Sequence, residues 1–517
     1  MDQTRRIHTR WPIWLFALAA TASSAFAQQQ AAPLTFTLTF DPSITDSFTG
    51  RVYVMLSTGR QEPRFGPAWF NTQPFYAMEV RDWKAGQPVV IDDRADGFPG
   101  RPSALTEGEY SIQAVMRRNL DSPSIGTGEG TAYSAVARRA INGATSGNLG
   151  LHLDQVVKGQ AFRETEQIKL VELRSTMLSD FHHRDVVMRA AVVLPKDYEE
   201  HPERRYPAMY WIGGFGSDHR AARFMMRAWE ATGYGDQIVR VVLDPLCYGG
   251  HHVFADSPNN GPRGSALVQE FIPHIEQAFR LLPSPHARFL SGHSSGGWSS
   301  LWLQISYPDF FGGTWSIAPD PVDFRDFQRI DLTRPGVNMY LDEQGDRRPL
   351  ARQGDEVMAQ YDEFAKMEAV YGEGGQLRSF EWVFSPPKED GTGLPQPLYD
   401  RESGMVNAEV ADAWKRYDIR LTLEENWTEL APKLEDGRKL RVFMGDVDTF
   451  YLEGATKLLK QSQEQLGSKA VIEIEPGRDH GSIASPELRK RIDREMVAEF
   501  SAHHPEYAVP APASLTP

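Results

Sequence analysis

One serine of this chain lies in a sequence context suited to nucleophilic chemistry. The segment GHSSG, residues 292–296, follows a short apolar run at 288–290 and precedes a helical pattern that starts at Gly297. A serine in a sharp turn between a strand and a helix has an exposed hydroxyl, and glycines on either side relieve the crowding there. Ser295 lacks a glycine two places before it, so Ser294 is the predicted nucleophile.

The residues that would activate this serine lie further along the chain. A serine hydroxyl needs a histidine base that a carboxylate holds in place. The apolar run 440–444 leads to Asp446 and Asp448, and the apolar run 471–474 leads to His480. The order serine, acid, histidine is one in which such triads occur. Asp448 is favoured over Asp446, because a short turn after the strand lets its carboxylate reach the imidazole.

Two backbone N–H groups are expected to stabilise the oxyanion of a tetrahedral intermediate. The residue after the nucleophile, Ser295, supplies one of them. The second is expected from the turn after an early strand, where residues 209–212 run into the glycine-rich segment 213–216. Glycines allow backbone N–H groups to approach the developing charge, so Gly214 or Phe215 is the predicted donor. A glycine-rich turn without a catalytic role is the alternative.

Neither the other histidines nor the single cysteine forms a pattern with chemistry of its own. His182-His183 and His251-His252 are adjacent pairs, and adjacent side chains in an extended segment point opposite ways. No H-E-x-x-H motif accompanies them, so neither a metal nor a cofactor is expected. Cys247 is the only cysteine, which excludes an intramolecular disulfide, and we expect it to be packed and inert.

Strands and helices that alternate over residues 165–505 are expected to position these groups. This pattern predicts a doubly wound, mostly parallel α/β sheet. A long segment rich in aromatic and charged residues, 320–438, interrupts it and is expected to form a folded insertion over the active site, with Trp382, Trp414 and Trp427 as a candidate apolar wall. The predicted strands are 186–194, 209–212, 238–243, 289–290, 314–317, 440–444 and 471–474, and the predicted helices are 265–281 (kinked at Pro273), 298–305, 455–466 and 487–500.

The amino-terminal part of the chain has a different periodicity. Residues 34–40 alternate apolar and threonine side chains, which is typical of a half-buried strand. Further short strands are expected at 52–56, 88–91, 110–116 and 149–157, separated by glycine, proline and aspartate clusters. This pattern predicts a small all-β sandwich domain over residues 28–160.

The two ends of the chain and its composition restrict where it acts and what it binds. Residues 1–27 combine arginines, an apolar stretch and Ala25-Phe26-Ala27, the pattern of a cleaved signal peptide. We therefore expect a periplasmic or secreted protein with no membrane anchor after cleavage, and a flexible tail at 506–517. The net charge of −14 and the lack of a basic stripe argue against nucleic-acid binding.

The chain resembles the putative-esterase branch of the α/β hydrolases, which includes enterochelin esterases, feruloyl and acetylxylan esterases, S-formylglutathione hydrolases and mycolyltransferases. The resembling segments cover most of residues 165–500 except the insertion. The resemblance implies an α/β-hydrolase fold with Ser294, Asp448 and His480 as the catalytic triad and Ser295 in the oxyanion hole. The segments that carry it are 210–216, LVQEFIPHIEQAF at 267–279, FLSGHSSGG at 289–297, YPDFF at 307–311, and 445–448 with His480.

These residues predict a serine-dependent carboxylic ester hydrolase that acts through an acyl-enzyme. Its expected substrate is a small-molecule ester, such as a siderophore or a carbohydrate-linked ester. Acyl transfer to a carbohydrate or lipid acceptor would use the same triad and is the first alternative. A binding protein on an inactive hydrolase scaffold is the second, and the complete set of triad residues argues against it.

Overall fold

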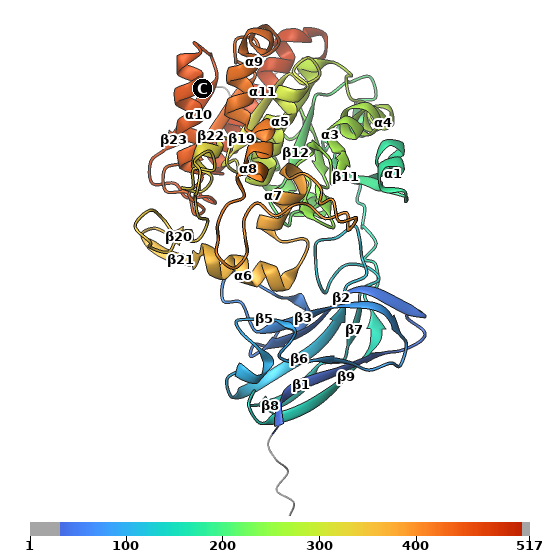
Figure 1. Ribbon diagram of the computed structural model, residues 1–517. Helices are drawn as coiled ribbons and strands as arrows, with labels where there is room; N and C mark the ends of the chain where they lie inside the picture. The colour runs from blue at the N-terminus through green and yellow to red at the C-terminus, as the bar shows by residue number, and fades with distance from the viewer. Residues whose placement is uncertain (1–31, 509–517) are drawn as a thin grey trace, which may run out of the picture.

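The structure is a computed structural model, and it describes residues 32–508. The predicted signal peptide 1–27 and all but the first residues of the predicted tail lie outside the described residues. The 3-10 turn Pro505–Tyr507 after the last helix extends into the segment 506–517 that we expected to be a tail. Figure 1 shows an all-β region at one end of the molecule and a mixed α/β region at the other.

The described amino-terminal residues form a nine-stranded sheet with the order β4-β1-β9-β7-β6-β2-β3-β5, in which β8 also pairs with β6. The alternating side chains of β1 explain why this segment forms a strand with one buried face. Its apolar side chains are buried and the threonines between them are half-buried; the buried residues are Leu34, Phe36, Leu38 and Phe40. The sandwich form of this region stays a prediction. The strands are β1 (Ala32–Phe40), β2 (Ser47–Ser57), β3 (Phe75–Lys84), β4 (Val89–Ile91), β5 (Asp96–Phe98), β6 (Gly108–Met116), β7 (Ala132–Ser134), β8 (Ala137–Ile141) and β9 (Ser146–Val156).

The second sheet is mixed and mostly parallel. Its order in the described residues is β10-β11-β13-β12-β18-β19-β22-β23, and only β10 and β11 run antiparallel to their neighbours. Its central strands are almost wholly buried because helices cover both faces. The strands are β10 (Ile168–Arg174), β11 (Val187–Val193), β12 (Ala208–Ile212), β13 (Val239–Leu243), β18 (Arg288–His293), β19 (Gly313–Ile317), β22 (Leu440–Gly445) and β23 (Val471–Glu475).

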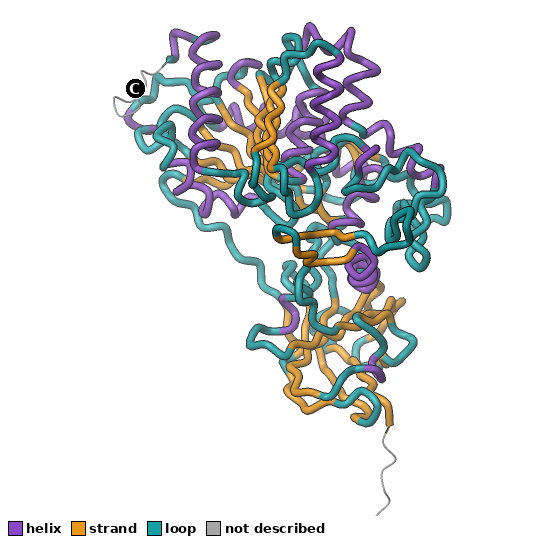
Figure 2. Tube along the Cα trace, turned by 90° about the vertical axis from the view of Figure 1, so that its left-hand side faces the viewer, coloured by secondary structure: helices purple, strands orange, loops and turns teal. Residues whose placement is uncertain are grey.

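The helices of the α/β region flank this sheet, and several short hairpins lie in its loops (Figure 2). The helices are α1 (Thr176–His182), α2 (Ala222–Glu230), α3 (Arg263–Ala266), α4 (Ile272–Ala278), α5 (Ser295–Ser306), α6 (Tyr361–Tyr371), α7 (Gln376–Phe384), α8 (Ala408–Trp414), α9 (Ile419–Lys433), α10 (Glu453–Gln465) and α11 (Pro486–His503). The hairpin strands are β14 (Leu246–Cys247), β15 (Gly250–His251), β16 (Asp256–Ser257), β17 (Gly261–Pro262), β20 (Pro349–Gln353) and β21 (Glu356–Gln360).

The helix predicted at 265–281 is broken in a different way from the one we expected. A π-helix at Leu267–Phe271 joins α3 to α4, and Pro273 lies in the first turn of α4, where a missing N–H costs nothing. The elements of this region that we did not predict include β10, α1 and α2.

The segment between β19 and β22 contains α6 to α9 and the β20–β21 hairpin. In Figure 1, α6 and this hairpin lie between the all-β region and the rest of the α/β region. Both polar and apolar contacts cross this boundary: the hydroxyl of Tyr53 donates to the carbonyl of Tyr371 over 2.7 Å, Arg51 donates to the carbonyl of Val370, and Trp69 packs on Phe364. The insertion is therefore anchored on the all-β region as well as on the sheet that carries Ser294.

No helix in residues 32–508 is both long enough and apolar enough to cross a membrane.

Candidate active site

Ser294 occupies the sharp turn between β18 and α5. Its backbone has φ 61° and ψ −125°, a strained conformation for a residue with a side chain, and such strain collects at functional positions. The two flanking glycines make the turn possible. A side chain at Gly292 would collide with the carbonyl of Gly296, and one at Gly296 would collide with the carbonyl of Ile212. The structure therefore bears out the strand-turn-helix context predicted for the GHSSG segment.

His480 and Asp448 form a close polar pair at this edge of the sheet. Nδ1 of His480 lies 2.7 Å from Oδ2 of Asp448, and Asp448 is fully buried. The other carboxylate oxygen of Asp448 accepts from the backbone N–H of Phe450 over 2.8 Å. Burial acts to lower the pKa of His480, but the charge and hydrogen bond of Asp448 outweigh it, so this pKa is raised above its usual value.

Asp446, the alternative acid, lies elsewhere. Its carboxylate accepts from the backbone N–H of Gly477 over 2.6 Å, which ties the turn after β22 to the turn after β23. Only Val447 separates it from Asp448 in the chain, and the structure places only Asp448 against the imidazole.

His480 contacts His293, the residue that precedes Ser294. The ring of His293 lies 4.7 Å from the ring of His480, and Nε2 of His293 lies 2.8 Å from the carbonyl oxygen of His480. Burial lowers the pKa of His293 to about 4, so it donates to that carbonyl as a neutral ring. Among the described residues no hydrogen bond joins Ser294 to His480, and such contacts often tighten only when substrate binds.

Asp320 is the carboxylate nearest to the nucleophile. It follows β19, the strand between those that end at Ser294 and at Asp446. Its Oδ2 accepts from the hydroxyl of Ser295 over 2.6 Å, and its Oδ1 accepts from the hydroxyl of Ser294 over 3.4 Å. The side chain is buried, and this burial raises its pKa to about 6 against the opposing hydrogen bond from Ser295.

The glycine-rich turn after β12 lies against the nucleophile, as predicted. A Cβ atom on Gly214 would stand only 3.1 Å from Cβ of Ser294, so a larger residue would crowd the serine. In residues 32–508 the N–H groups of Gly214 and Phe215 donate to no protein acceptor, so both are free for an oxyanion. His251 supports this turn through a contact of 3.0 Å between its Nε2 and the carbonyl of Gly213.

A pocket opens at Ser294 and Asp320. Three parts of the chain line it. The α/β core contributes Ser294, Phe450 and Leu452, the all-β region contributes Trp69 and Phe70, and the insertion contributes Asp320, Pro321, Gln328, Leu350, Ala351, Phe364, Gln376, Leu377 and Phe380. The mostly apolar lining with a few polar groups is typical of a small-molecule site.

The insertion lines this pocket, but not through the tryptophans that we expected there. Trp414 is buried among Phe324, Phe327 and Phe384, so it belongs to the core of the insertion. Trp382 packs on Tyr248. Neither of these two, nor Trp427, lines the pocket, because the periodicity of a segment does not say which of its aromatic residues face inward.

Sequence reasoning missed three residues that the structure brings to the site. Asp320 could have been found by the argument that identified Asp448, because it too follows the carboxyl end of a predicted strand. Trp69 lies in a loop of the all-β region and Gln376 starts a helix of the insertion. No local pattern announces that these two segments fold against Ser294.

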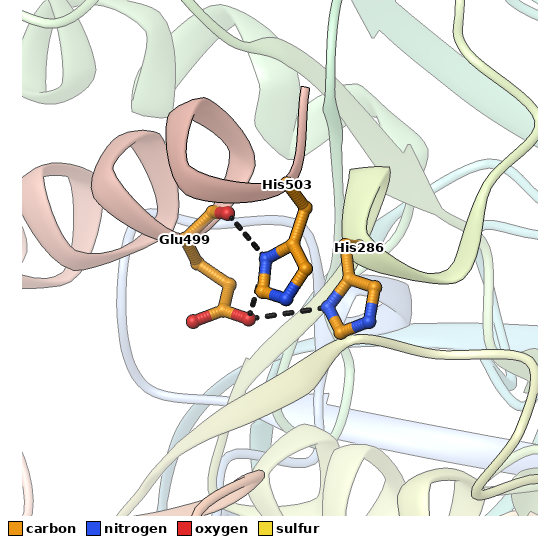
Figure 3. A group of neighbouring side chains, drawn as sticks. All are labelled: His286, Glu499 and His503. Atoms are coloured by element: carbon orange, nitrogen blue, oxygen red, sulfur yellow. Dashed lines mark hydrogen bonds and ion pairs between the residues drawn. The ribbon is translucent and has the colours of Figure 1, made fainter. Parts of the chain in front are cut away.

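A cluster of His286, Glu499 and His503, which sequence reasoning also missed, lies away from this site (Figure 3). Its signal was the i, i+4 spacing of Glu499 and His503 on α11. Nitrogen and oxygen atoms of the three residues lie within 4.8 Å of one another. The two imidazole rings, however, stack face to face at 3.6 Å, so their lone pairs lie in parallel planes and do not converge on one ion.

The remaining histidine pairs and the cysteine have the following surroundings. His252 is buried and its pKa is lowered well below the usual value by that burial. Nε2 of His182 contacts the carbonyl of Asn260. Cys247 is a buried free thiol whose pKa is raised by burial, as expected for an unreactive side chain.

Comparison with known proteins gives one family. The family described as "Putative esterase" matches residues 185–433, just under half of the chain. A search of curated proteins found no match.

Several solved structures are similar to the chain at low sequence identity. A ferulic acid esterase is 16% identical with a TM-score of 0.40, and the alignment covers 65% of this chain and 99% of that one. An S-formylglutathione hydrolase from Agrobacterium tumefaciens is 14% identical with a TM-score of 0.37, covering 65% and 94%. A fluorophosphonate-binding serine hydrolase from Staphylococcus aureus is 13% identical with a TM-score of 0.37, covering 64% and 98%.

Proposed function

We propose that this chain, whose residues 185–433 match the esterase family, is a serine-dependent carboxylic ester hydrolase with Ser294, Asp448 and His480 as its triad. The observation that carries the proposal is the contact of 2.7 Å between His480 and Asp448 at the sheet edge where Ser294 occupies its strained turn. The substrate is a small ester that fits the pocket beside Ser294.

The chemistry follows from these positions. The hydroxyl oxygen of Ser294 attacks the ester carbonyl while His480 takes its proton, and Asp448 holds the imidazole and stabilises its charged form. The N–H groups of Ser295 and of Gly214 or Phe215 stabilise the oxyanion. The alcohol leaves with the proton from His480, and water then releases the carboxylic acid from the acyl-enzyme by the same steps in reverse.

The test compares Ser294→Ala with Ser295→Ala on 4-nitrophenyl acetate and with a fluorophosphonate probe. Loss of Ser294 should lower kcat by about 10⁴-fold or more and abolish labelling by the probe. Ser295→Ala keeps its backbone N–H and should retain labelling. Labelling that persists in Ser294→Ala and disappears in Ser295→Ala would refute the assignment.

We also propose that the protein is exported, on the strength of the leader pattern at residues 1–27. Expression of the full chain followed by cell fractionation and amino-terminal sequencing tests this. A mature protein that begins near Gln28 outside the cytoplasm is expected, and an intact leader on a cytoplasmic protein would exclude export.

A further inference from the structure

Asp320 is a buried carboxylate with no arginine or lysine partner among residues 32–508. The groups that act most strongly on its pKa, besides burial itself, are Ser295, His480, Asp448 and Ser294. The buried carboxylate of Asp493, by contrast, pairs with Arg240 at 2.6 Å. A buried charge is costly unless it is paired.

The amide groups near Asp320 also present acceptors. Nε2 of Gln376 contacts the hydroxyl of Ser295 at 3.5 Å, which leaves its Oε1 buried without a partner. Nε2 of Gln328 donates to the carbonyl of Phe450 over 3.3 Å, and its Oε1 is likewise buried and unpartnered. Both residues line the pocket. A ligand that fills it must therefore bring hydrogen-bond donors.

The rest of the lining favours a charged donor over a neutral one. The aromatic residues Trp69, Phe70, Phe364, Phe380 and Phe450 form much of the wall. Aromatic faces attract cations, and a carboxylate bonds an ammonium group more strongly than a neutral hydroxyl. A primary ammonium also carries three N–H donors, enough for Asp320 and the two glutamine oxygens, whereas a quaternary ammonium carries none.

Distances place such a group next to the ester carbonyl. An attacking oxygen stands about 3–3.5 Å from the carbonyl carbon, and an α-amino nitrogen lies about 2.5 Å from that carbon by bond geometry. A carboxylate oxygen 3.4 Å from the oxygen of Ser294 can therefore bond an α-nitrogen that lies on its side of the ester carbonyl.

We propose that Asp320, with Gln376, binds the protonated α-amino group of the acyl part of the substrate, so that the preferred substrates are esters of α-amino acids. This inference rests on the proposed ester hydrolysis at Ser294. The ammonium has a second effect besides binding. It neutralises a carboxylate that bonds to Ser295, whose N–H stabilises the oxyanion, so the amine should raise kcat as well as lower KM.

Three matched esters test the proposal: the ethyl esters of phenylalanine, of 3-phenylpropanoic acid and of 2-hydroxy-3-phenylpropanoic acid. They differ only in whether the α-carbon carries an ammonium, a hydrogen or a hydroxyl. At pH 7 the value of kcat/KM should be about 10- to 100-fold higher for the amino ester than for the other two. Equal values for the three esters would overturn the proposal.

The variants Asp320→Asn and Asp326→Asn separate recognition from a general loss of activity. In Asp320→Asn the ratio of amino to desamino ester should fall to within about threefold of one. Asp326 follows the same strand but caps the backbone N–H of Arg329 outside the pocket, so Asp326→Asn should keep the wild-type ratio. An Asp320→Asn variant that lowers kcat/KM for all three esters by one factor keeps the ratio and contradicts the proposal.

Binding to Ser294→Ala, measured by calorimetry with the same esters, distinguishes this inference from the proposed hydrolysis. Tighter binding of the amino ester by Ser294→Ala supports the inference even if the wild-type enzyme turns over none of the three. Hydrolysis of the desamino ester that depends on Ser294, without any preference for the amine in rate or binding, leaves the proposed function intact and refutes the inference.

Discussion

The turns after β19 and β22 each place a buried aspartate at the carboxyl edge of neighbouring strands, yet the two carboxylates have different surroundings. Asp448 is surrounded by donors: the imidazole of His480 and the backbone N–H of Phe450. Asp320 accepts only from the hydroxyls of Ser294 and Ser295 and faces the pocket. The carboxylate of Asp448 is satisfied by protein donors and contacts the proposed base, His480, whereas that of Asp320 keeps acceptor capacity for a ligand.

Substitution of Asp448 should have the largest effect on activity. Asp448→Asn removes the charge that orients and stabilises protonated His480, so kcat should fall by about 10³- to 10⁴-fold for every ester, with or without an amine. Steady-state kinetics on the three phenylpropanoate esters measures this.

The matched control is Asp446→Asn, which alters a surface carboxylate two residues away. Its bond to the N–H of Gly477 is lost, but kcat should stay within a few-fold of the wild type. A larger loss in Asp446→Asn than in Asp448→Asn would transfer the role of the acid to Asp446.

Replacing Asp320 and replacing Asp448 by asparagine should change the free energy of unfolding in opposite directions. The pKa of Asp320, about 6, exceeds the value of about 3.9 for an unfolded chain, so the folded state binds more protons between these pH values. The stability due to this protonation is complete below about pH 4 and is lost as the pH rises through about 6, up to about 3 kcal/mol. Asp320→Asn should therefore gain in free energy of unfolding relative to the wild type between pH 4.5 and 7.5, measured by urea denaturation.

Asp448→Asn serves as the counterpart in the same measurement. It weakens a buried hydrogen bond to His480 and should lower the free energy of unfolding at pH 7.5. A gain in Asp320→Asn that is the same at both pH values would show that its carboxylate is not destabilised by burial.

The sequence predicted the residues around Asp448 better than the residues that line the pocket around Asp320. Ser294, Asp448 and His480 each follow a strand with a clear apolar run, so chain order and strand ends were enough to bring them to one edge. Trp69 and Gln376 reach the pocket only because a loop of the all-β region and the insertion pack over that edge. Such packing depends on three-dimensional complementarity that no periodicity encodes.

The fold divides in the same way. The period-two pattern of β1 and the apolar runs of β18 and β22 were sufficient to predict those strands. The path of the insertion was not predictable, because Trp414 and the pocket residue Phe380 are equally apolar in the sequence. Which of them lines the pocket is decided by the tertiary arrangement of α6 and α7.

Substitution of Trp69 tests whether substrate binding in the pocket depends on the all-β region. Its ring packs on Phe215, Phe364 and Phe450 at centroid distances of 5.5 to 6.0 Å. Trp69→Ala should raise KM by about 10-fold and change kcat much less, because it removes binding surface but no reacting group. Phe65→Ala, an exposed residue of the same loop that lies outside the pocket, should leave KM unchanged. Equal KM values for the two variants would exclude a role of Trp69 in binding.

The smallest effect should appear in the pH dependence, where the two carboxylates act on the same imidazole. The pKa of His480 is raised because Asp448 and, to a lesser extent, Asp320 outweigh the opposing effect of burial. A protonated imidazole cannot accept the proton of Ser294, so kcat/KM for the desamino ester should rise with pH, with an apparent pKa above the usual 6.5. Asp320→Asn removes one negative charge near the imidazole and should shift this apparent pKa downward by less than one pH unit.

The pH profile of Asp326→Asn should coincide with that of the wild type, since the carboxylate of Asp326 is not among the groups that act most strongly on His480. A downward shift of the apparent pKa that occurs only in Asp320→Asn would show that the charge of Asp320 acts on the imidazole of His480. An upward shift would contradict that placement, because loss of a nearby negative charge cannot stabilise an imidazolium.

The same profile recorded with the amino ester adds a further check. A bound ammonium offsets the charge of Asp320, so the profiles of the wild type and Asp320→Asn should lie closer together for the amino ester than for the desamino ester.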